Sequence, residues 1–73
     1  AENCTVIGAD AGRSITTGSQ NTVLGKNASY TNGITTGSNN MLLGYEATPS
    51  AATVSNEITL GNSSVNNLRL YKD

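Results

Sequence analysis

The sequence predicts an all-β fold in which short strands follow one another in successive repeats. Three observations predict it: an apolar pentapeptide that recurs and ends in glycine, turn-forming residues between its copies, and a composition unsuited to helices. Asn, Thr, Ser and Gly fill about half of the 73 residues, and the four basic and five acidic residues nearly cancel. Thr, Val and Ile favour strands, whereas β-branched residues, Asn and Gly interrupt every window in which a helix would form.

Four short apolar runs carry the repeat. They are Cys4–Gly8 (CTVIG), Asn21–Gly25 (NTVLG), Asn40–Gly44 (NMLLG) and Glu57–Gly61 (EITLG), and their glycines are 17, 19 and 17 residues apart. We expect each run to be a strand that glycine ends, at a sharp turn or a positive φ. Three residues after the first three glycines stands a residue small enough for close approach of the next layer: Ala11, Ala28 and Ala47.

The segments between these runs have turn chemistry. Ile15–Ser19 and Ile34–Ser38 both read ITTGS, and Asn32-Gly33 is a strong two-residue turn signal. The 19-residue unit gains its two extra residues between Tyr30 and Gly33. We therefore expect a single repetitive segment over 1–73, with repeats at about 1–18, 19–37, 38–54 and 55–73.

The last repeat departs from the pattern, as terminal repeats often do. Leu68 and Leu70 alternate with Arg69 and Tyr71, which predicts a half-buried terminal strand. The chain opens on Ala1 without an initiator Met, and we expect it to be a fragment of a longer protein.

The strands are apolar on both faces in the middle repeats. The residue before each glycine is large and apolar, and so is the residue at the centre of most runs, which points to the opposite face. A strand that is apolar on both faces is covered on both faces. We expect one face to line the interior of the coil and the other to pack on a neighbouring chain, and we assign the interchain core to Ile7, Leu24, Leu43 and Leu60.

Composition points to an oligomer. The large apolar side chains are four Val, four Ile, six Leu, one Met and three Tyr, with no Phe or Trp. A core this small rarely stabilises a monomer without a disulfide, a metal or a partner. The single cysteine, Cys4, cannot form an internal disulfide, and the absence of His removes the commonest metal ligand. Cys4 aligns with Asn21 and Asn40, and we expect a small, half-buried free thiol there.

The units NTVLG…ITTGSNN…LLGY, followed by NEITLGNSSVNNLRL over Asn56–Leu70, resemble the repeat region of phage tail fibres and related trimeric surface fibres. In those proteins the repeats often precede a C-terminal chaperone domain. The NTVLG units are also similar to the head repeats of trimeric autotransporter adhesins, which have shorter spacing. The resemblance implies an intertwined parallel homotrimer forming a β-roll, β-solenoid-like or β-prism fibre. It also implies an extracellular location, on a virion tail or a bacterial cell surface, and attachment to a host or prey surface.

Two residue types in the loops are candidates for recognition. Tyr30 and Tyr45 are the only aromatic residues in the repeat loops, and Asn32 lies in the longest one. Exposed aromatic rings beside amides and hydroxyls can stack on the sugars of a cell-surface glycan or polymer. The alternative is that each ring covers an apolar edge of the next layer.

Several function classes find little support. We expect no enzyme, no catalytic residue, no cofactor and no metal site, because the five carboxylates are scattered and no His is present to act as a base. Without a basic stripe we expect no nucleic-acid partner, and without a long apolar run we expect no membrane insertion. Three alternatives to receptor binding stay open: a structural spacer without ligand, a depolymerase whose acids meet between subunits, and an ice-binding surface. The ice-binding surface needs Thr rows on one face, whereas Thr16-Thr17 and Thr35-Thr36 are adjacent.

Overall fold

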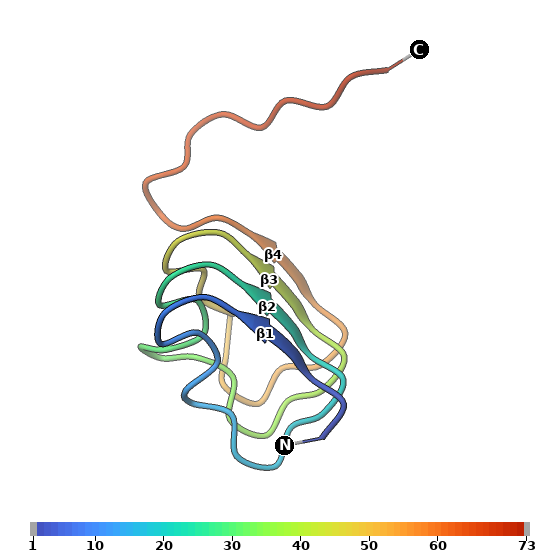
Figure 1. The fold of residues 1–73 in the computed structure, drawn as a ribbon. Coiled ribbons are helices and arrows are strands. Elements are labelled where there is room, and N and C mark those ends of the chain that lie inside the picture. Colours follow the sequence, from blue (N-terminus) through green and yellow to red (C-terminus); the bar gives the residue numbers. More distant parts are fainter. Residues whose placement is uncertain (1, 73) are drawn as a thin grey trace.

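The computed structural model describes residues 2–72 and is built from four short parallel strands. They are β1 (Thr5–Ile7), β2 (Thr22–Leu24), β3 (Met41–Leu43) and β4 (Ile58–Leu60), and they form one sheet in the order β1-β2-β3-β4. Figure 1 shows the strands side by side, and after each of β1, β2 and β3 a long excursion returns to start the next strand. The described residues contain no helix, so none that could cross a membrane. The all-β expectation is confirmed.

The strand register follows the sequence repeat. Val6 pairs with Val23, Val23 with Leu42, and Leu42 with Thr59, so equivalent residues of successive repeats lie side by side. Each strand consists of the three residues before a repeat glycine, as the pentapeptides predict. We call the passes of the chain that contain β1 to β4 layers 1 to 4.

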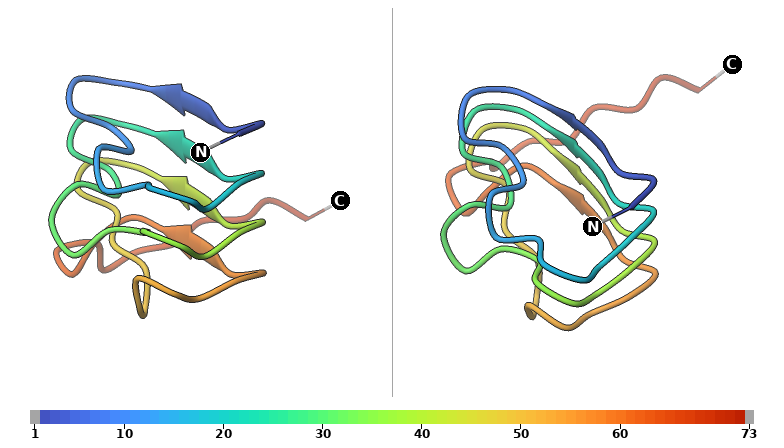
Figure 2. Two further views of the ribbon diagram at one scale, coloured as in Figure 1. Left: turned by 90° about the horizontal axis from the view of Figure 1, so that it is seen from below. Right: turned by 60° about the horizontal axis from the view of Figure 1, so that its bottom comes forward.

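The loops stack in register as well (Figure 2). The Thr16 N–H donates to the Thr35 carbonyl at 2.9 Å, and the Thr35 N–H donates to the Ala52 carbonyl at the same distance. Beyond the glycines, the Ser29 N–H donates to the Ala47 carbonyl at 2.9 Å. Backbone groups outside the strands therefore also find hydrogen-bond partners in the next layer.

The interior of the stack is lined by the middle residue of each strand. Val23 and Leu42 are fully buried there, together with Ile34 from the opposite side of layer 2. Two alanines complete the buried cluster, and three residues are partly buried against it: Ala28 and Ala47, then Ala11, Ile15 and Val54. The close approach expected of the alanines is therefore confirmed for Ala28 and Ala47.

The residues assigned to the interchain core lie on the other face of the sheet. Ile7, Leu24 and Leu60 are exposed in the single chain, and Leu43 is half-buried. The physical reason is strand alternation: the residue before the glycine points away from the side chains that fill the interior. Packing of this outer face on another chain stays a prediction.

The repeat glycines are required by the spacing of the layers. Gly25 has φ of 129°, and a Cβ atom there would lie 2.5 Å from the Gly44 carbonyl oxygen. Gly8 faces Gly25 in the same way, with its Cβ position 2.6 Å from the Gly25 oxygen. A side chain at this corner would both strain the backbone and push the layers apart.

A buried asparagine ladder runs up the stack just before the strands. The Asn21 side chain accepts from the Asn40 backbone N–H at 3.0 Å and donates to the Gly37 carbonyl at 3.0 Å. Asn40 repeats this one layer down, accepting from the Glu57 N–H at 3.0 Å and donating to the Val54 carbonyl at 2.8 Å. Cys4 occupies the same position in layer 1 as a half-buried free thiol, as the alignment with asparagine predicts.

The expectation of a half-buried terminal strand at residues 68–71 is wrong for this chain. After layer 4 begins, the chain leaves the stack and runs away from it as an extended segment (Figure 1). Residues 66–72 have no strand partner, and Leu68, Leu70 and Tyr71 are largely exposed. The segment is extended, as its alternating pattern predicts. Within residues 2–72, however, no other part of the chain covers the side that carries Leu68 and Leu70.

Candidate surface-recognition site

Tyr30 lies at the end of a loop and is already in contact with a cation. The Arg13 guanidinium lies over its ring, 5.4 Å from the ring centre, and the Tyr30 carbonyl accepts from the Ser14 hydroxyl. Arg13 is held by an ion pair with Asp10 at 3.0 Å. The hydrogen bond that Arg13 donates to the Asp10 carboxylate raises the pKa of Arg13 above its ordinary value. One face of the ring is therefore covered by Arg13 before any ligand arrives.

Tyr45 is exposed and follows the third repeat glycine directly. Its backbone carbonyl accepts from the Asn62 side chain of the next layer, which fixes the backbone at this corner. The two tyrosines stand at different positions of the repeat, one and five residues after their glycines. Neither of them lines the cavity to which Asn32 contributes.

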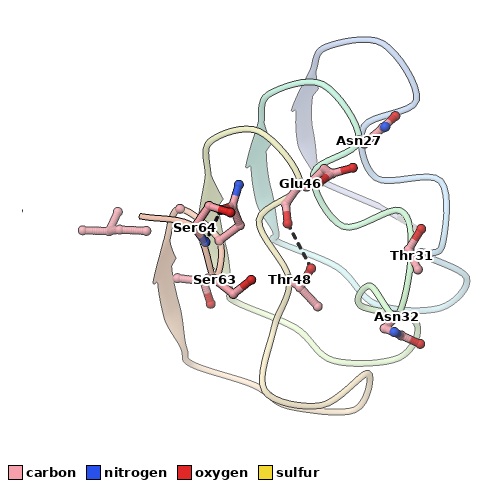
Figure 3. A pocket seen from close by; sticks show the side chains of 11 residues that line it. Asn27, Thr31, Asn32, Glu46, Thr48, Ser63 and Ser64 are labelled. Carbon is pink, nitrogen blue, oxygen red and sulfur yellow. Dashed lines mark hydrogen bonds between the residues drawn. The ribbon is translucent and has the colours of Figure 1, made fainter. Parts of the chain in front are cut away.

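Asn32, the third candidate, does line one. A cavity of about 660 Å³ lies beside the loops that follow the glycines. Its walls come from layers 2, 3 and 4 and are formed by Asn27, Thr31, Asn32, Glu46, Thr48, Thr59, Leu60, Gly61, Asn62, Ser63 and Ser64. In Figure 3, Thr31 and Asn32 lie on one side of this hollow, Ser63 and Ser64 on the other, and Glu46 and Thr48 between them.

Local backbone geometry places the walls of this polar pocket. Asn27 and Glu46 are equivalent residues, two after their glycines, and both adopt left-handed backbone, with φ of 60° and 55°. Asn32 is also left-handed, with φ of 55°, and lies in a turn, but Gly33 is not left-handed, so the predicted two-residue turn at Asn32-Gly33 does not form. Asparagine tolerates this conformation better than most residues. The opposite wall is fixed by Asn62, whose Oδ1 accepts from the Ser64 N–H at 2.8 Å.

The pocket is polar and carries one charge. Its lining offers amides, hydroxyls and the Glu46 carboxylate, with Leu60 as its one large apolar side chain. The hydroxyl proton of Thr48 already has a partner, because it is donated to the Glu46 carbonyl at 3.0 Å. Asn27 Oδ1 is buried and has no hydrogen-bond partner within the described residues. Such a surface binds by hydrogen bonding rather than by apolar burial.

A second electrostatic feature in layers 3 and 4 is Glu57, which does not line the pocket although its partner Thr59 does. The Glu57 carboxylate accepts from the Ser50 N–H at 3.0 Å and from the Thr59 hydroxyl at 3.4 Å. The hydrogen bond from Ser50, supported by that from Thr59, lowers the pKa of Glu57 below its ordinary value. This carboxylate joins a loop to a strand and has a structural role.

No motif in the sequence points directly to the pocket. Of the three candidate residues only Asn32 contributes to it, whereas the sequence analysis predicts no recognition role for Asn27, Glu46, Thr48 and Ser64. The available signal was the two-residue insertion before Gly33, because an extra length of loop in one layer creates an overhang beside its neighbours. Within residues 2–72, no group of three or more His, Cys, Asp or Glu side chains gathers to hold a metal ion.

Comparison with known proteins gives no relative to reason from: no family model, no curated protein and no solved structure matches this chain. The site and the fold therefore stand on their own geometry.

Proposed function

We propose that this chain is a segment of a trimeric extracellular fibre that contributes to attachment to a host or prey surface. In this proposal the four layers form a β-solenoid-like unit, and three parallel copies pack through the outer faces of their sheets. The fibre belongs to a virion tail or to a bacterial cell surface, in keeping with the resemblance of Asn56–Leu70 and the NTVLG units to such fibres.

The observation that carries the proposal is the apolar outer face of the sheet, which we define as Ile7, Leu24, Met41, Leu43, Ile58 and Leu60. Ile7, Ile58 and Leu60 are 61%, 67% and 50% exposed, and Leu24 and Met41 are each 37% exposed. These residues are contiguous, because they lie on neighbouring strands in register. Contiguous exposed apolar surface of this kind marks an interaction site.

The small interior supports the same conclusion. Among residues 2–72, five hydrophobic residues are buried in the single chain, and two of them are alanines. Burial of an exposed Leu or Ile contributes about 1.5–3 kcal/mol. Covering the outer face on each copy adds apolar burial to that of the interior, which is the stabilisation that so short a chain needs.

The test is the mass of the folded protein in solution. Light scattering at micromolar concentration should give three times the 7.5 kDa mass of one chain. The double variant Ile58→Thr, Leu60→Thr keeps strand-forming residues but removes apolar surface, and should reduce the mass to that of one chain. As a control, Val65→Thr changes an exposed apolar residue outside the sheet and should leave the mass unchanged. A wild-type chain that is folded and monomeric would overturn the proposal.

A further inference from the structure

We propose that the polar pocket between layers 2, 3 and 4 is a binding site for an oligosaccharide that is neutral or bears a free amine, and that it rejects acidic sugars. The inference rests on the proposed attachment function and names the site and the class of ligand through which attachment takes place. It moves recognition from Tyr30 and Tyr45 to the pocket lined by Glu46, Asn32, Thr31, Thr48 and Ser64.

The chemistry of the lining selects a ligand with many hydroxyl groups. Ligand pockets for apolar molecules are lined mainly by hydrophobic and aromatic side chains. Here Asn, Thr, Ser and Glu side chains face a cavity of about 660 Å³, and its one large apolar residue, Leu60, also belongs to the outer face of the sheet. Amides and hydroxyls both donate and accept, so they match the alternating donors and acceptors around a sugar ring.

The charge of the lining decides between classes of sugar. Glu46 is the one charged residue among the described residues that line the pocket, and none of them is Lys or Arg. An acidic sugar would place its carboxylate beside Glu46 with no cation to compensate. A neutral sugar donates hydroxyls to the Glu46 carboxylate, and an amino sugar adds an opposite charge. Hydrogen bonds of this charge-assisted kind are roughly twice as strong as neutral ones.

A metal ion is a poorer match to the same residues. Hard cations such as Ca²⁺ take six to eight oxygen ligands, among them several carboxylates in high-affinity sites. The pocket supplies one carboxylate, and no group of three acidic, His or Cys side chains gathers in the described part of the chain.

Asn27 adds a group that is free to respond to a ligand. Its Oδ1 is buried without a hydrogen-bond partner among residues 2–72. Turning this oxygen toward the pocket therefore breaks no hydrogen bond that it makes, while an unsatisfied buried acceptor is unfavourable where it is. A sugar hydroxyl that reached it would satisfy an acceptor that the chain leaves unpaired.

The experiment is titration calorimetry on the assembled protein with four named probes. The trimers of N-acetylglucosamine and of glucosamine represent neutral and amine-bearing sugars, and 3′-sialyllactose and trigalacturonic acid represent acidic ones. We expect binding of the first two only. Glu46→Gln should weaken binding of the glucosamine trimer by roughly tenfold or more, because one charge-assisted interaction is lost. Asn32→Gly suits the left-handed backbone but removes the side-chain amide, so it should weaken binding of both sugar trimers.

Asp10→Asn is the matched control. Asp10 holds the position of Glu46 in layer 1, with left-handed φ of 59°, but it does not line the pocket. The Asp10→Asn variant should bind both sugar trimers as the wild type does. Equal binding of the acidic probes, binding of none of the four, or an unchanged affinity in Glu46→Gln would each overturn the inference. Light scattering on the same samples separates the two proposals. A trimeric protein that binds no neutral or amino sugar refutes only the proposed sugar site, whereas a folded monomeric protein refutes the proposed trimeric fibre.

Discussion

At the scale of single residues, the stack is held by positions that repeat from layer to layer. The asparagine ladder satisfies backbone groups that would otherwise be buried without partners between layers, since Asn21 and Asn40 each bond two backbone groups. An unsatisfied buried polar group costs about 1–3 kcal/mol, so these side chains fix the register as firmly as the apolar ones do. Layer 1 departs from the rule at Cys4, where a sulfur lies 3.9 Å from the Gly18 carbonyl that an amide would reach.

Replacing Cys4 by Asn should therefore stabilise the protein. The new amide is placed to donate to the Gly18 carbonyl and to accept from the Asn21 N–H, as Asn21 and Asn40 do one layer further on. Net hydrogen bonds contribute about 0.5–1.5 kcal/mol each, so we expect a gain of about 1–2 kcal/mol. Urea unfolding measures it, with Cys4→Ala as a control that adds no bond. A midpoint for Cys4→Asn at or below that of the wild type would contradict the ladder.

Glu57 makes stability depend on acid pH. Its pKa in the folded protein is lowered by Ser50 and Thr59 from an ordinary value of 4.5, so the ionised form binds its partners better than the neutral form does. The contribution is fully present above pH 4.5 and is lost as the pH falls through the folded pKa. We expect urea midpoints of the wild type to fall more between pH 7 and pH 3 than those of Glu57→Gln. Glu2→Gln, the same change elsewhere, should behave as the wild type; identical profiles for all three would contradict this role.

At the scale of the strands, the sequence predicted the elements and left their two faces ambiguous. The pentapeptides locate all four strands, because a short apolar run that ends in glycine is compatible with few structures other than a strand. The assignment of the residue before each glycine to the interchain core does not follow from the runs alone, since Val23 and Leu24 are both apolar. The interior belongs to Val23 and Leu42 because Ile34 and the alanines meet them across the layer. That closure depends on loop geometry, which local sequence patterns do not specify.

Two substitutions separate the faces. Leu42→Ala removes a fully buried side chain and should cost about 2–5 kcal/mol per chain at every protein concentration. Leu60→Ala removes an exposed one, and in the proposed trimer its effect is on association. We expect a reduced unfolding midpoint for Leu42→Ala even in samples that light scattering shows to be dissociated. For Leu60→Ala, the loss should vanish under those conditions. Equal losses for both variants in dissociated samples would mean that the assigned interior is wrong.

At the scale of the whole molecule, the two ends of the stack differ in structure. They also differ in how far the sequence predicts them. Val6 is 40% exposed at the layer 1 end, whereas its partner Val23 is fully buried. At the layer 4 end the same position is Thr59, whose polar side chain suits a terminal surface. The pocket lies at this second end, where layer 4 departs from the regular path before completing a turn. It depends on the meeting of three layers, so no single segment of the sequence contains its pattern.

The proposed trimer makes stability depend on concentration, and this is the sharpest test of the whole assembly. Unfolding of a trimer releases three chains, so tenfold dilution lowers its free energy of unfolding by about 2.7 kcal/mol, or about 0.9 kcal/mol per chain. For a domain of this size that corresponds to a fall in Tm of roughly 4–7 °C. Circular dichroism melts from 5 to 500 µM measure it over two such steps. Ile58→Thr, Leu60→Thr, which lacks apolar surface on the outer face, should melt at one temperature throughout this range. A wild-type Tm that is equally constant would show that the outer face is not an interface.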